Sequence, residues 1–294
     1  MFFDLAVLGL VSAGFYILLA SGITLIFGVM RIVNLAQGQF VLLGGYVTYS
    51  ISALLIRNSY LSIIPSMLVV AGLAIVIERF TFRRVLGRTL VGGVSQAPFF
   101  IGFGLLYIME NAMSQIWGDQ PIVISSPFIT RTVRIGTIGI SADWIIVIFC
   151  SFLVTAGLYV FLQRTRLGRA IRATSQNKHE AMLAGINIGH IYSLTFGIGI
   201  GLGALGGSLM GIVSAMTPDA GSDQLFIAFA IIILGGLGSV EGAVIGGLVY
   251  GIVESFTSYY LGGYSSEALI FLVMAVILVV RPMGIFGIKT AVDT

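Results

Sequence analysis

Long apolar stretches dominate the chain, and short polar segments separate them. The stretches lie at residues 5–28, 40–56, 61–77, 91–117, 144–162, 191–215, 225–237, 240–260 and 268–280. A helix needs about 20 apolar residues to cross a hydrocarbon core of about 30 Å. The stretches are continuous, whereas the strands of a membrane β-barrel alternate between apolar and polar residues. The pattern therefore predicts membrane-spanning helices.

We expect an all-α fold, a polytopic transmembrane helical bundle with eight or nine spans in one membrane domain over residues 1–294. The segment near 225–239 is shorter than the others, so it is either a short span or a re-entrant half-helix. Composition agrees with a lipid environment, because 57% of the residues are hydrophobic and only 9% are charged. Soluble domains carry about 25% charged residues.

Basic residues are unevenly distributed among the polar segments. Twelve of the 15 lie in residues 79–90 and 163–190, at Arg31 and in the C-terminal tail. Short loops rich in Lys and Arg face the cytoplasm. The bias predicts an outside N-terminus, a cytoplasmic C-terminus and an odd number of spans, which favours nine.

Two loops are long enough to carry structure of their own. Residues 118–143 form the predicted external loop, in which 121–124 and 132–135 favour β-structure, so we expect a small cap. Residues 163–190 form the predicted cytoplasmic loop. There, Ser175 is expected to cap a short helix from about Asn177, and Gly185 is expected to end it. Such a helix either lies passively at the membrane interface or inserts into a groove of a soluble partner.

Polar side chains at membrane depth are costly and tend to face the interior of the bundle. The segment 31–40 is the most unusual, because Asn34, Gln37 and Gln39 lie between two apolar stretches and Gly38 permits an irregular backbone. It is either a substrate or gating element or a simple tight turn. Other candidates for a polar path, or for hydrogen bonds between helices, lie inside apolar stretches: Glu110, Asn111 and Glu254.

Glycines recur at four-residue spacing in residues 197–211 and 242–251. In lipid, this spacing favours close approach of helix backbones. The match of 201–206 to the dinucleotide pattern G-x-G-x-x-G lies inside an apolar helix and outside any βαβ unit, so it predicts no nucleotide site. We also expect no metal site, since the single Cys and two His have no partners at ligand spacing.

Four blocks follow one another along nearly the whole chain. They are Gly22-Ile-Thr-Leu-Ile-Phe-Gly with Asn34-Leu-Ala-Gln-Gly, residues 169–186, Leu234-Gly-Gly-Leu-Gly-Ser with 240–247, and Arg281-Pro-Met-Gly with 285–287. Together these blocks resemble the LivH type of branched-chain amino acid ABC transporter permease, and their order is that of the family.

The resemblance implies a membrane permease subunit of an ATP-binding cassette importer, without enzymatic activity, in the bacterial inner membrane. It would form half of a path for a branched-chain or similar hydrophobic amino acid. Its implied partners are a second, related permease of the LivM type, two ATP-binding subunits and a periplasmic substrate-binding protein, and no nucleic acid. ATP would be bound by the partners, and this chain would hold no cofactor.

In such importers a cytoplasmic coupling helix docks into the ATPase. The resemblance assigns this role here to Glu180, Ala181, Ala184, Gly185 and Ile186. Family members often carry His at the position of Gln37 and Glu at that of Gln39. These departures leave urea, short amides and aromatic acids open as solutes. A secondary, ion-coupled transporter is the alternative class, and it would need several intramembrane carboxylates.

Overall fold

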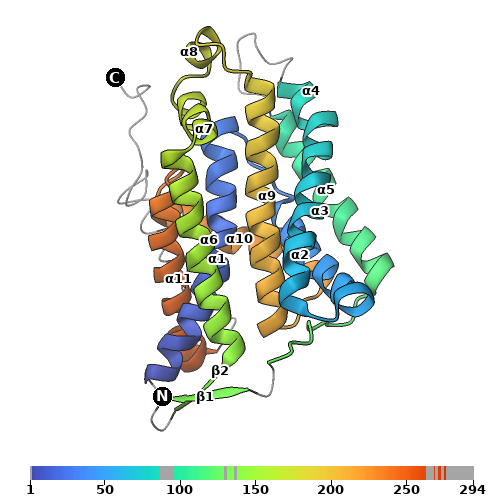
Figure 1. The fold of residues 1–294 in the computed structure, drawn as a ribbon, viewed down its shortest axis with the longest axis vertical. Coiled ribbons are helices and arrows are strands. Elements are labelled where there is room, and N and C mark those ends of the chain that lie inside the picture. The colour runs from blue at the N-terminus through green and yellow to red at the C-terminus, as the bar shows by residue number, and fades with distance from the viewer. Residues whose placement is uncertain are drawn as a thin grey trace.

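The computed structural model describes residues 2–86, 96–128, 131–135 and 138–262, together with 268, 271, 272 and 275. It is a helical bundle with one small β-hairpin (Figure 1). The long helices are α1 (Phe2–Met30), α2 (Gln37–Ile51), α3 (Ser59–Phe80), α5 (Ala97–Trp117), α6 (Ala142–Arg164), α9 (Ile188–Val213), α10 (Gly221–Gly235) and α11 (Val240–Leu261). The shorter elements are a π-helical turn (Ser52–Ile56), α4 (Phe82–Leu86), α7 (Arg166–Gln176), α8 (Lys178–Leu183) and a 3₁₀ turn (Pro218–Ala220).

Eight helical segments in the described part of the chain are long and apolar enough to cross a membrane. This confirms the predicted polytopic helical bundle. Most of the predicted span at 268–280 lies outside the described residues, as do Arg88 and the basic residues of the C-terminal tail. The orientation of the chain remains a prediction.

Helices α1 and α9 form the centre of the bundle. They pack against each other, and α2, α3, α6, α10 and α11 surround them (Figure 1). Most residues of both central helices are buried around their whole circumference. A helix that is apolar all round is expected in such a position, and the long apolar sequences of α1 and α9 meet that condition.

Glycines bring the helix backbones into contact. A Cβ on Gly207 of α9 would lie 1.9 Å from the carbonyl oxygen of Val41, and a Cβ on Gly251 of α11 would lie 2.5 Å from the amide nitrogen of Ala13. No side chain fits at either place. The four-residue glycine spacing therefore has the packing role that the sequence predicted.

The segment that joins α5 to α6 contains the hairpin. Strand β1 (Thr132–Ile135) pairs antiparallel with β2 (Ile138–Ser141). The other β-favouring segment, 121–124, does not join this hairpin. Ile122 instead exchanges backbone hydrogen bonds of 2.9 Å with Met216, beyond the end of α9.

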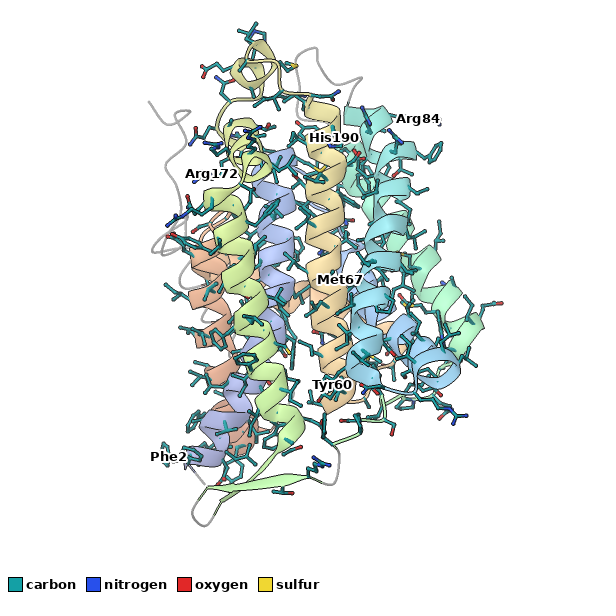
Figure 2. All side chains as sticks on the ribbon, viewed as in Figure 1. Phe2, Tyr60, Met67, Arg84, Arg172 and His190 are labelled. Carbon is teal, nitrogen blue, oxygen red and sulfur yellow. The ribbon has the colours of Figure 1, made fainter. Side chains whose placement is uncertain are left out.

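The two ends of the bundle differ in what they carry. The α8 end holds α4, α7 and α8, and the hairpin end holds the N-terminus and the two strands (Figure 1). Arg84, Arg172 and His190 lie toward the α8 end, whereas Phe2 and Tyr60 lie toward the hairpin end (Figure 2).

Candidate functional site

The break between α1 and α2 buries three amide side chains. Asn34, Gln37 and Gln39 are 4%, 1% and 0% exposed. The irregular backbone covers only residues 31–36, because α2 begins at Gln37. The two glutamines therefore belong to the first turn of a helix, and the prediction that Gly38 supplies the irregular backbone is wrong.

Only part of the hydrogen-bonding capacity of these amides is used. The Asn34 Oδ1 accepts from the Ala36 amide at 3.1 Å, and the Gln37 Nε2 donates to the Gly199 carbonyl at 3.4 Å. The Asn34 Nδ2, the Gln37 Oε1 and both polar atoms of Gln39 have no hydrogen-bond partner among the described residues. Buried polar groups are normally paired, so unpaired ones indicate a strained or functional site.

The site lies deep inside the bundle. Gly199, which accepts from Gln37, is the twelfth of the 26 residues of α9. At 1.5 Å per residue, it lies about 17 Å from the start of that helix and about 21 Å from its end. Helix α2 therefore begins near the middle of the bundle, not at one of its ends.

Helix α10 begins beside the start of α2. A Cβ on Gly38 would lie 1.8 Å from the carbonyl oxygen of Gly221, and a Cβ on Gly221 would lie 2.5 Å from the Gln39 Cδ. From this crossing α10 leads toward Gly238, which lies close to Gly28 at the far end of α1. The short segment 225–237 thus belongs to a helix that starts inside the bundle, and it is one of the eight candidate spans, so the short-span alternative holds.

A helix N-terminus carries a partial positive charge from its aligned peptide dipoles. Two helices begin at this crossing, and three neutral amides lie beside them in the interior of the bundle. Broken helices at membrane depth are tolerated where protein covers them or where they line a cavity. The arrangement can bind a small polar group that both donates and accepts hydrogen bonds.

The other three sequence-predicted path residues lie elsewhere. Asn111 is exposed on α5 and donates to the Tyr107 carbonyl at 2.8 Å, while Glu110 beside it is partly exposed. Glu254 on α11 accepts a 2.8 Å hydrogen bond from the Tyr16 hydroxyl on α1. The structure therefore brings together Asn34, Gln37 and Gln39, and separates from them Glu110, Asn111 and Glu254.

The polar loop at the α8 end folds into two short helices. Asn177, and not Ser175, caps α8, because its Oδ1 accepts from the amides of His179 and Glu180. Ser175 lies within α7 and donates to the Arg172 carbonyl. The prediction of a Ser175 cap is wrong, since α7 runs on to Gln176 and leaves Asn177 as the junction.

Gly185 ends α8 as the sequence predicted. Its φ of +82° is left-handed, and its amide bonds to the Met182 carbonyl while the Ile186 amide bonds to the Ala181 carbonyl. This pair of hydrogen bonds is a Schellman motif. Within the predicted coupling set, Glu180, Ala184 and Gly185 are exposed and Ile186 is partly buried. Ala181 is buried, so it packs against the rest of this chain and is not available to a partner.

Comparison with known proteins places the chain in a family. The sequence model described as "Branched-chain amino acid transport system / permease component" matches residues 5–280. This chain belongs to that family of permease components. It is similar to the high-affinity branched-chain amino acid transport system permease proteins BraD of Pseudomonas aeruginosa, at 32% identity, and LivH of Escherichia coli, at 31%. The alignments cover 95% of this chain and 94% and 93% of the two relatives.

LivH of Salmonella typhimurium is 30% identical over 95% of this chain and 93% of its own length. The permease is therefore a multi-pass membrane protein that matches these relatives over nearly their whole length. The family resemblance expected from the sequence blocks is confirmed.

Two features of the permease escaped prediction from sequence. The first is Gln224 in the first turn of α10, whose buried Oε1 has no hydrogen-bond partner among the described residues. Its place just before a short apolar stretch was the available signal. The second is Leu183 at the tip of α8, which is 77% exposed. Together with the adjacent Met182, which is 43% exposed, it forms a small apolar tip on a polar loop.

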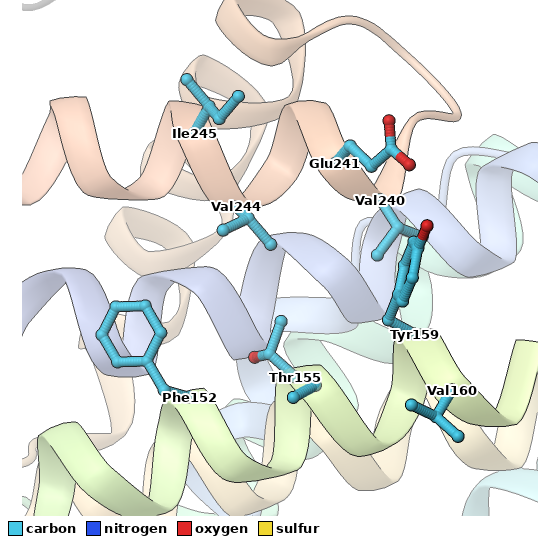
Figure 3. Close-up of a pocket in the computed structure, with 9 residues that line it drawn as sticks. Phe152, Thr155, Tyr159, Val160, Val240, Glu241, Val244 and Ile245 are labelled. Atoms are coloured by element: carbon cyan, nitrogen blue, oxygen red, sulfur yellow. The ribbon is translucent and has the colours of Figure 1, made fainter.

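The permease also has an apolar cavity of about 430 Å³ between α6 and α11 (Figure 3). Its walls come from Phe152, Tyr159, Val244, Ile245 and neighbouring residues. This cavity lies away from the three amides and offers few polar atoms. Its chemistry suits a lipid chain or an apolar side chain, and we do not place a polar path there.

Proposed function

We propose that the permease forms half of the import path for a branched-chain or similar hydrophobic amino acid in an ATP-binding cassette importer. The observation that carries this proposal is the crossing of α2 and α10, where Asn34, Gln37 and Gln39 are buried with unused hydrogen-bonding atoms. The names of the relatives supply the solute class.

The chemistry of the site suits an amino acid. A zwitterion carries an acceptor carboxylate and a donor ammonium group, and each amide side chain both donates and accepts. Helix N-termini inside a membrane favour a substrate carboxylate. Neutral amides also avoid the cost of a permanent charge at this depth. Urea, short amides and aromatic acids share part of this chemistry, so they are the competitors in the test below.

An ion-coupled transporter has less support. Glu110 and Glu254, the carboxylates predicted within apolar stretches, lie on different helices and contact different neighbours. Among the described residues, no group of three or more His, Cys, Asp and Glu side chains is close enough to hold a metal ion. The described residues therefore show no carboxylate cluster of the kind that an ion-coupled transporter would need.

We assign the α8 end to the cytoplasm of a bacterial cell and the hairpin end to the periplasm. Basic residues support this orientation, because the α8 end carries Arg79, Arg83, Arg84, Arg164, Arg166, Arg169, Arg172 and Lys178. A periplasmic binding protein would then deliver the solute at the hairpin end. The bacterial inner membrane is the proposed location.

The α7–α8 element is the proposed contact with an ATP-binding subunit. Leu183 and Met182 would enter a groove of that subunit, and Gly185 would fix the chain direction after α8. The complete importer would contain a second permease of the LivM type, two ATP-binding subunits and the binding protein. ATP would be bound and hydrolysed by those partners, and the permease would hold no cofactor and catalyse no reaction.

The test is uptake by the purified complex in proteoliposomes. We expect ATP-dependent uptake of labelled leucine in the presence of the binding protein, with competition by isoleucine and valine but not by urea, acetamide or benzoate. Gln39→Leu should abolish uptake while the complex stays assembled. Gln120→Leu, at an exposed position of the loop after α5, is the matched control and should transport normally.

Competition by urea, acetamide or benzoate, without competition by branched-chain amino acids, would overturn the solute class. Normal uptake by Gln39→Leu would remove the α2–α10 crossing from the path.

A further inference from the structure

The exposed surface of α5 carries a polar stripe in its second half, beside the exposed apolar residues Ile108, Ala112 and Ile116. Tyr107 is 51% exposed, and Asn111 and Gln115 follow it at four-residue spacing and are also exposed. Residues four apart lie on one side of a helix. Glu110 is partly exposed beside them. We call these four residues, Tyr107, Glu110, Asn111 and Gln115, the α5 polar face.

This face lies at membrane depth. Helix α5 ends at Trp117, six residues after Asn111, so Asn111 lies about 9 Å inside that end at 1.5 Å per residue. Polar and ionisable groups at such depth face other protein or a water-filled cavity, because hydrocarbon cannot hydrogen-bond to them. The Asn111 Nδ2 bonds to its own helix at Tyr107, but that bond leaves its amide oxygen and the Glu110 carboxylate to be accommodated.

Other outward-facing helices of the bundle differ at the same depth. Between residues 61 and 76, the exposed residues of α3 are Leu61, Ile64, Leu68, Val69, Gly72, Leu73 and Val76. Between residues 145 and 157, those of α6 are Ile145, Phe149, Leu153, Ala156 and Gly157. Both sets suit contact with lipid. The α5 polar face does not, so protein or protein-bound water must cover it within the membrane.

Helix α5 also adjoins the proposed path. A Cβ on Gly102 would lie 2.8 Å from the amide nitrogen of Leu35 and 3.5 Å from the Asn34 Oδ1. Near the other end of α5, the Trp117 Nε1 donates to the Ser50 hydroxyl at 2.8 Å. One side of α5 therefore covers α2 and the buried amides, while Tyr107, Asn111 and Gln115 lie on the opposite side and Glu110 lies between the two.

We propose that the α5 polar face contacts the second permease subunit. The inference rests on the proposed function, since it takes the permease to work in a pair. A soluble binding protein cannot reach about 9 Å below the end of a membrane helix, and lipid cannot pair with the polar groups. A second membrane subunit with polar groups of its own meets both conditions.

Photo-crosslinking in the intact transporter tests this assignment. The photoreactive residue p-benzoylphenylalanine would replace Asn111 or Gln115 on α5 and, as matched controls, Leu68 on α3 or Phe149 on α6. The full complex is irradiated in native membranes and then purified, and the adducts are identified by mass spectrometry. We expect permease–permease adducts from positions 111 and 115, and lipid adducts alone from positions 68 and 149.

Lipid adducts alone from 111 and 115, or a permease adduct from 68 or 149, would overturn the assignment of this face. Recovery of ATP-binding subunits with each variant shows that the complex has assembled. A complex that contains ATP-binding subunits but lacks the expected adducts contradicts the α5 assignment only. A chain that never recovers those subunits, in any variant or in the parent, contradicts the proposed function itself.

Discussion

The contact between the starts of α2 and α10 leaves no room for a side chain at residue 38. Gly38→Ala would place a Cβ 1.8 Å from the Gly221 carbonyl oxygen, 2.9 Å from its carbonyl carbon and 3.0 Å from the Leu225 amide nitrogen. These are backbone atoms, so they cannot rotate away as a flexible side chain would. The substitution must push the two helix starts apart.

The size of the displacement follows from the distances. Ordinary van der Waals contact begins at 3.4 Å, and the oxygen lies at 1.8 Å, so the crossing must open by 1.6 Å. Overpacking of this kind typically costs about 1–3 kcal/mol. Replacing glycine by alanine within a helix returns up to about 1 kcal/mol. With the full return from alanine, the net loss in stability is up to about 2 kcal/mol, and we expect it together with a large loss of uptake.

The matched control is Gly72→Ala on α3, where an added Cβ would have no atom within 4 Å. It should be neutral or slightly stabilising. The assay measures the thermal midpoint of the purified complex by size-exclusion fluorescence and measures leucine uptake in proteoliposomes. If Gly38→Ala matches both the parent and Gly72→Ala in both readouts, the close crossing of α2 and α10 is refuted.

Four further substitutions, at three positions, separate the coupling element from the packing of the bundle. The backbone of Gly185 is left-handed, and an added Cβ would have no atom within 4 Å. Gly185→Asn should therefore retain the ATP-binding subunits, while Gly185→Val should bind them about 5–30-fold more weakly, because a β-branched residue is strained there by about 1–2 kcal/mol. Equal retention by the two variants would contradict this. Asn177→Ala removes the α8 cap and should weaken the same interaction by about 1 kcal/mol, as measured by titrating the ATP-binding subunit; unchanged affinity would argue against α8 as the docking element. Tyr16→Phe removes the hydrogen bond to Glu254 and should lower the thermal midpoint through a loss of about 1 kcal/mol without affecting uptake; lost uptake at unchanged stability would instead place Glu254 on the path.

The helices were predictable because their apolar stretches are long and uninterrupted. The end of α8 was predictable for a local reason, since a glycine that follows a run of helix formers commonly adopts the left-handed conformation found at Gly185. The start of α8 was not. Ser175 and Asn177 are both good capping residues, and the choice between them depends on how far α7 continues.

The candidate site was predictable only in part. Three amides between apolar stretches indicated an unusual segment, and the structure buries all three. The partner of that segment is the start of α10, more than 180 residues away in the sequence, and no local pattern links Gly38 to Gly221. For Glu110, Asn111 and Glu254, the sequence showed polar residues at depth. It did not show which side of each helix faces a neighbour, because these helices are apolar on most of their circumference.

The central claim is that this permease works as the membrane half of an ATP-driven importer. The most direct measurement is purification of the chain from its native membrane in mild detergent, with quantitative mass spectrometry of the proteins that accompany it. We expect ATP-binding subunits and a second permease in stoichiometric amounts, and a Gly185→Arg variant that loses the ATP-binding subunits but keeps the second permease. Recovery of the chain alone, or only as an oligomer of itself without any ATP-binding subunit, would rule out the importer and favour an ion-coupled transporter.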